Sequence, residues 1–270
     1  MVAASGDQPP IRVRCHEPAL AERGVVVWAH GGSWVAGSID AWHEPCSAMA
    51  RACGMAVVSV NYRLAPRWHH PAPLEDVMQV LRWAAREFVT ADGQPPLMVG
   101  GDSAGATIAA SAALRCRSDG PVLAGQILAY PPLDPSCAQL SYFRQPERFP
   151  TRERMLAAWH SYRGPAPVDS AKPPLTPWAE ADLSGLPPAI FGFGEDDPVA
   201  DDSWRFAERL AQHGNQVSLR AFGRAGHGLF LQRRADGSFP LQEWIAGRLR
   251  VTHPVSHTSQ SLTSNRGPDR

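Results

Sequence analysis

The clearest capacity for chemistry in this chain lies in one serine and the glycines around it. A short apolar run, Leu97 to Val99, leads into Gly101-Asp102-Ser103-Ala104-Gly105, and small helix-forming residues follow. This order predicts a strand, a sharp turn and a helix, with the serine hydroxyl raised above the end of a sheet. Taken alone, Gly-x-Ser-x-Gly also occurs in ordinary turns. Ser103 is therefore a candidate nucleophile that needs partners elsewhere in the chain.

A serine nucleophile needs a general base to take its proton and an acid to orient that base. Where a serine occupies such a strand-to-helix turn, the acid follows it in the chain and the histidine comes last. The apolar run 189–193 ends in Glu195-Asp196-Asp197-Pro198, and Asp201 and Asp202 follow. We expect Asp201 and Asp202 to cap the next helix, because a helix start favours negative charge. Pro198 fixes the turn behind Asp197, which makes Asp197 the candidate acid.

The candidate base is His227, which stands between Gly226 and Gly228 after the alternating run 216–222. Flanking glycines let the ring project over the end of a sheet without steric conflict. The chain has 10 histidines, and His227 is one that lies downstream of both Ser103 and Asp197 and on a predicted loop.

A second glycine cluster could stabilise the negative charge that forms on a carbonyl oxygen under attack. The apolar run 25–29 leads into His30-Gly31-Gly32-Ser33-Trp34. We expect the backbone amides of Gly31 and Gly32 to point at one spot, with the amide of Ala104 completing an oxyanion hole. The alternative interpretation of this cluster is a plain tight turn.

These residues can meet only if strands place them at one edge of a sheet. The apolar pattern of the sequence predicts such strands. Seven runs predict strands, at 11–15, 24–29, 55–60, 96–100, 125–130, 189–193 and 216–222. Helical patterns alternate with them, as in Leu74, Val77, Met78 and Leu81. This alternation predicts an α/β fold with a mostly parallel central sheet, helices on both faces, and function at the carboxyl ends of the strands.

The stretch 134–180 interrupts the alternation with prolines and aromatic residues. We expect it to form a small lid insertion with a helix near 151–162, although each aromatic residue could simply pack the insertion on the core. Residues 1–250 are predicted to form a single domain. The polar tail 251–270 is predicted to be disordered.

Composition excludes several classes of function. The 26 basic and 26 acidic side chains give a formal net charge of zero, which argues against nucleic acid or an anionic membrane as a partner. We find no membrane-spanning run and no secretory signal, so a cytoplasmic location is expected. The five cysteines are scattered, which favours reduced thiols over disulfides and shows no metal-ligand spacing.

Taken together, the motifs resemble the hormone-sensitive-lipase-like family of α/β-hydrolase esterases. The resemblance runs from about residue 11 to residue 230 and rests on His30-Gly31-Gly32-Ser33-Trp34, Asn61-Tyr62-Arg63-Leu64-Ala65-Pro66, Gly101-Asp102-Ser103-Ala104-Gly105, Tyr130-Pro131-Pro132-Leu133-Asp134, Asp197-Pro198-Val199 and Gly226-His227-Gly228. It implies an α/β-hydrolase fold, hydrolysis of short- or medium-acyl esters without metal or organic cofactor, and a catalytic triad of Ser103, Asp197 and His227.

Three departures from the family pattern stand out. Ser33 replaces the third glycine of the usual His-Gly-Gly-Gly, and Arg67 stands where a glutamate is usual. Only a short leader precedes Ile11, where family members usually carry a helical arm that covers part of the pocket. We therefore expect the substrate pocket to be open on the side that receives the alcohol part of the ester. We also expect a preference for short-acyl esters, including acetyl esters of small natural products.

Two other functions remain open. An amidase or aryl formamidase would use the same triad on a different leaving group, and a non-catalytic small-molecule receptor could share the scaffold. The expected partner is a small-molecule ester, and a homodimer is one possible oligomeric state.

Overall fold

The computed structural model describes residues 10–18, 24–89, 93, 95–165 and 174–252. Seven strands form one sheet in the order β1-β3-β2-β4-β5-β6-β7. Their bounds are β1 Val13–His16, β2 Val25–Ala29, β3 Ala56–Val60, β4 Leu97–Asp102, β5 Gly125–Ala129, β6 Ala189–Gly194 and β7 Val217–Phe222. Only β1 runs antiparallel to its neighbour, β3. The predicted mostly parallel sheet is confirmed, and each strand lies within two residues of its expected bounds.

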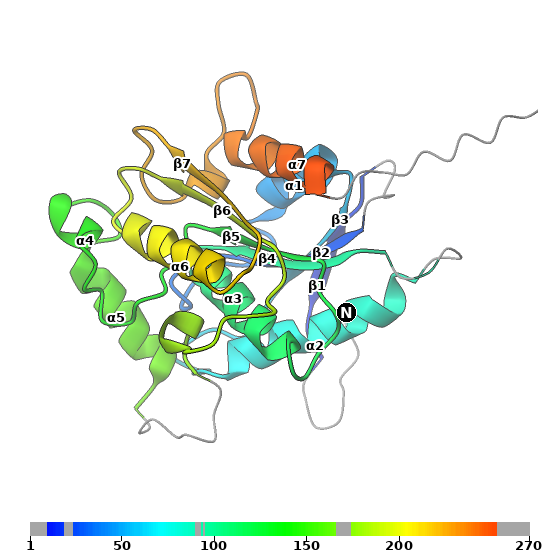
Figure 1. The fold of residues 1–270 in the computed structure, drawn as a ribbon, viewed down its shortest axis with the longest axis horizontal. Helices are drawn as coiled ribbons and strands as arrows, with labels where there is room; N and C mark the ends of the chain where they lie inside the picture. The colour runs from blue at the N-terminus through cyan, green and yellow to red at the C-terminus, as the bar shows by residue number, and fades with distance from the viewer. Residues whose placement is uncertain (1–9, 19–23, 90–92, 94, 166–173, 253–270) are drawn as a thin grey trace, which may run out of the picture.

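Helices cover both faces of this sheet (Figure 1). On one face α1 (His43–Cys53) packs beside α7 (Pro240–Thr252), and on the other lie α2 (Ala72–Glu87), α3 (Ala104–Cys116) and α6 (Ala200–Gln212). Every residue of β2, β3, β4, β5 and β6 is buried, as expected of strands enclosed on both faces. Because β2 to β7 are parallel, the loops at their carboxyl ends gather at one edge of the sheet.

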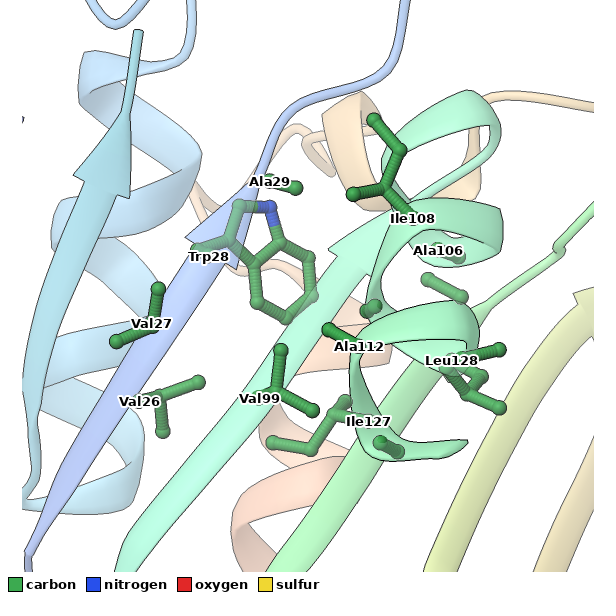
Figure 2. Packing of buried hydrophobic residues seen from close by; sticks show 14 of the residues in the cluster. Val26, Val27, Trp28, Ala29, Val99, Ala106, Ile108, Ala112, Ile127 and Leu128 are labelled. Carbon is green, nitrogen blue, oxygen red and sulfur yellow. The ribbon is translucent and has the colours of Figure 1, made fainter. Parts of the chain in front are cut away.

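The core brings α3 very close to the central strands (Figure 2). Its Ala106, Ile108 and Ala112 lie beside Trp28 of β2 and other large apolar residues of the sheet, all fully buried. Space for the Trp28 indole comes from Gly100 on β4, where an added Cβ would lie 2.8 Å from the ring. Trp28 is thereby held against β4, the strand that leads into Ser103.

The predicted insertion is held to the core by its first residues. It contains α4 (Ser141–Arg144), α5 (Arg152–Arg163) and the 3-10 turn η1 (Pro177–Ala179). Asp202, fully buried in the first turn of α6, accepts hydrogen bonds from the amides of Leu133 (2.8 Å) and Asp134 (3.0 Å). Asp201 accepts one from the amide of Ser141 at 2.9 Å. Both carboxylates thus lie in the first helical turn, as expected, but they fasten the insertion instead of capping their own helix.

The aromatic residues of the insertion differ in burial, and Trp178 is partly buried. Tyr142, Trp159 and Tyr162 are fully buried, and the rings of Trp159 and Tyr162 pack on Trp34. They fix the insertion to the core, which was one of the two expected roles. Phe143 and Phe149 are instead exposed.

The last helix, α7, crosses the predicted boundary between the domain and the tail. Helix α7 continues to Thr252, so the start of the predicted tail is helical, and 253–270 lie outside the described residues. Among the helices that the structure describes, none is long and apolar enough to cross a membrane. The single-domain boundary at residue 250 stays a prediction.

Candidate active site

Ser103 occupies a sharp turn between β4 and α3. Its backbone has φ 51° and ψ −123°, and its amide donates to the carbonyl of Ala129 at 2.9 Å. The flanking glycines are required by space, because a Cβ on Gly101 would lie 2.4 Å from Gly105 and one on Gly105 would lie 2.1 Å from the Ala29 oxygen. Strained backbone of this kind persists only where the surroundings enforce it. The turn leaves the Ser103 side chain at the carboxyl edge of the sheet.

A chain of hydrogen bonds joins three residues that are distant in sequence. Ser103 Oγ lies 2.8 Å from His227 Nε2, and His227 Nδ1 lies 2.9 and 3.0 Å from the two carboxylate oxygens of Asp197. The side chains of His227 and Asp197 are 7% and 0% exposed. Because Nδ1 faces a carboxylate, it carries the ring proton, which leaves Nε2 free to accept the proton of Ser103. The arrangement can activate a serine for attack on a carbonyl carbon.

Asp197 and the neighbouring carboxylate of Asp196 have different partners. Oδ1 of Asp197 also accepts from the amide of Val199 at 2.9 Å, which fixes the carboxylate beyond the end of β6. Asp196 points elsewhere and pairs with Arg148 at 3.3 Å. The loop of Asp197 packs tightly on that of His227, since a Cβ on Gly194 would lie 2.1 Å from the Ala225 oxygen.

The amides of the glycine turn after β2 differ in their hydrogen-bond partners. The amide of Gly31 donates to Asp102 Oδ1 at 3.2 Å and is therefore already engaged. Gly32 and Ser33 follow with φ of 115° and 55°, and a Cβ on Gly32 would lie 2.2 Å from the Ala36 oxygen. Within the described part of the chain, the amides of Gly32, Ser33 and Ala104 have no hydrogen-bond acceptor. These three amides are therefore candidate donors to an oxyanion.

The family profile described as alpha/beta hydrolase fold matches residues 26–231, most of the chain. The protein belongs to the α/β-hydrolase family. Carboxylesterase NlhH of Mycobacterium tuberculosis is 37% identical over 220 residues, which cover 78% of this chain and 67% of that protein. An ethyl acetate hydrolase of Pseudomonas putida is 30% identical over 215 residues, with 78% and 67% covered. These similarities identify this α/β-hydrolase as a carboxylic ester hydrolase.

Solved structures agree with the sequence relatives. A hyperthermophilic esterase from the archaeon Pyrobaculum calidifontis superimposes on this α/β-hydrolase with a TM-score of 0.81 and 31% identity, covering 91% of this chain and 83% of that one.

No group of three or more His, Cys, Asp or Glu side chains in the described ranges could hold a metal ion.

Asp102 is the site residue that sequence reasoning missed in this hydrolase. Its carboxylate is fully buried, and Oδ1 accepts from the indole N–H groups of Trp28 (3.2 Å) and Trp42 (2.9 Å) as well as from Gly31. Burial raises the pKa of Asp102 to about 7, although these donors oppose the shift. Its place inside the nucleophile motif was a signal, but nothing in the sequence showed that two tryptophans would point at it.

Asp102 also reaches the histidine loop. The hydroxyl of Tyr130 donates to Asp102 Oδ2 at 3.4 Å and accepts from the amide of Phe230 at 3.0 Å. Trp28 stacks on Phe230 with ring centroids 4.4 Å apart. One buried carboxylate therefore connects the loops that carry Ser103, the candidate oxyanion donors and His227.

Proposed function

We propose that this hydrolase cleaves short-acyl carboxylic esters through a triad of Ser103, His227 and Asp197 and an acyl-enzyme intermediate. The observation that carries the proposal is the continuous hydrogen-bonded relay from Ser103 Oγ through His227 to Asp197. Asp197 orients the ring, His227 takes the serine proton, and Ser103 attacks the ester carbonyl. His227 then returns the proton to the leaving alkoxide, and a water molecule releases the acid by the same steps.

For the oxyanion hole we propose the amides of Gly32, Ser33 and Ala104. This assignment keeps two of the three expected donors and replaces Gly31 with Ser33, because the Gly31 amide already has the Asp102 carboxylate as acceptor. Ser33 would then act through its backbone, so a third glycine is not needed for the chemistry. Donors fixed in advance stabilise the developing charge at little reorganisation cost.

The short acyl group is supported by a relative whose name states that it hydrolyses ethyl acetate. The motifs that resemble those of the hormone-sensitive-lipase-like family support ester hydrolysis, and acetyl esters of small natural products belong to the proposal as candidate substrates. A cytoplasmic location and a homodimer belong to the proposal as sequence predictions, testable by cell fractionation and by size-exclusion chromatography with light scattering.

The test combines labelling with substrate profiling. A serine-directed fluorophosphonate should modify Ser103, identified by peptide mass spectrometry, and should not modify Ser103→Ala. Among p-nitrophenyl esters from acetyl to decanoyl, kcat/KM should be highest from acetyl to butyryl. Acetanilides and formanilides should react far more slowly. Preference for the anilides would favour the amidase or aryl formamidase alternative, and an unreactive Ser103 would favour the receptor.

A further inference from the structure

Phe149 is an exposed aromatic residue of the insertion that lies beside the catalytic relay. It is 60% exposed, and its ring centroid is 6.0 Å from that of His227, with the two planes 68° apart. An edge-to-face pair at this spacing is a favourable aromatic contact. One side of Phe149 therefore touches the base, while much of its ring faces solvent.

The neighbours of Phe149 hold it in this position. Arg148, the preceding residue, pairs with Asp196 at 3.3 Å, next to the triad acid. On the other side, Pro150 is buried and Thr151 caps α5, accepting from the amide of Arg154 at 3.3 Å. The Arg154 guanidinium lies 6.0 Å from the Phe149 ring. The exposed ring is thus placed by the insertion and is not a loose side chain.

The chemistry of acyl transfer decides which part of a substrate meets Phe149. His227 Nε2 must give its proton to the departing oxygen, so that oxygen lies about 3 Å from Nε2. The group attached to this oxygen then extends away from the edge of the imidazole ring, and Phe149 packs against the same imidazole. The acyl group, in contrast, stays on Ser103 and close to the oxyanion donors.

We propose that Phe149 determines specificity for the alcohol side of the ester and favours aromatic or other flat apolar alcohols. The inference rests on the proposed function and adds the class of leaving group to it. An aryl group that stacks on the exposed ring removes apolar surface from water, whereas a small alkyl alcohol covers little of it. Because the alcohol has left before deacylation, Phe149 affects acylation and leaves deacylation unchanged.

The test compares benzyl acetate with ethyl acetate, which form the same acetyl-enzyme and differ mainly in the aromatic ring. In Phe149→Ala, kcat/KM for benzyl acetate should fall about 5- to 20-fold, while that for ethyl acetate stays within about 2-fold. Phe149→Leu should show an intermediate loss because it keeps apolar surface without the ring. The deacylation rate of the acetyl-enzyme should be that of the wild type in both variants.

A matched control is Phe143→Ala, which removes another phenylalanine of the insertion that is 55% exposed and whose ring lies under Arg152. This variant should behave as wild type on both esters. Equal losses on benzyl and ethyl acetate in Phe149→Ala would mean that Phe149 only positions His227, and no loss on benzyl acetate would mean that it touches no substrate. Either result overturns the inference while fluorophosphonate labelling of Ser103 still supports the proposed function.

Discussion

At the scale of single residues, the relay predicts how its members depend on one another. Ser103→Ala, His227→Ala and Asp197→Asn should each fold and each lower kcat by about 10⁴-fold or more, and double variants should lose little further, because the three groups act as a unit. Steady-state kinetics with p-nitrophenyl acetate measures this. Asp196→Asn is the control: its carboxylate pairs with Arg148 beside Phe149 and not with His227, so this variant should lose at most the several-fold that Phe149 contributes. A greater loss in Asp196→Asn than in Asp197→Asn would contradict the assignment.

Asp102 offers a second prediction at this scale. Asp102→Ala would leave the indole N–H groups of Trp28 and Trp42 and the Gly31 amide without their acceptor, and each buried donor left in this way costs about 1–3 kcal/mol. We expect a fall of at least about 3 kcal/mol in the free energy of unfolding, measured by urea denaturation. Asp102→Asn keeps an acceptor oxygen and should lose far less. Wild-type stability of Asp102→Ala would show that the carboxylate does not hold these loops together.

At the scale of elements, two helical glycines in different surroundings make a matched pair. Gly105 starts α3 against β2, where a Cβ would lie 2.1 Å from a backbone oxygen. An added Cβ on Gly247 in α7 would meet no other described part of the chain within 4 Å. Gly105→Ala should therefore push α3 from the sheet and abolish both activity and much of the stability. Gly247→Ala should raise the free energy of unfolding by about 0.5–1 kcal/mol. Thermal unfolding and esterase assays distinguish the two, and a tolerated Gly105→Ala would refute the close approach.

The elements were also the part of the structure that sequence predicted best. Strands such as 25–29 and 189–193 are continuous apolar runs between turn residues, and local pattern suffices to find them. The order of Ser103, Asp197 and His227 along the chain likewise required only motifs. The pairing of Asp202 with Leu133 and Asp134, and of Asp102 with Trp42, depends on contacts between residues 60 or more apart. Local pattern carries no information about such partners.

At the scale of the whole molecule, buried acids make stability depend on pH. Burial raises the pKa of Asp102 to about 7 and that of Asp202 to about 8, whereas both carboxyls ionise near pH 4 in an unfolded chain. Between pH 4 and pH 8 the folded state therefore binds more protons than the unfolded state. The contribution of these two carboxyl groups to the free energy of unfolding falls as pH rises. The urea concentration at the unfolding midpoint should fall between pH 5 and pH 8, and the fall should be smaller in Asp202→Asn than in the wild type. An unchanged drop would show that Asp202 does not titrate in this window.

The position of the relay within the sheet has a kinetic consequence. Ser103 follows the central strand β4, but Asp197 and His227 follow β6 and β7, which end one side of the sheet, and the contact of Ser103 with His227 spans 124 residues. Contacts between such distant segments form slowly during folding. A refolding chain that has paired only β1 to β5 would hold Ser103 in its turn without the proposed base, His227. After dilution from denaturant, the rate at which esterase turnover recovers therefore reports the rate at which β6 and β7 join the sheet.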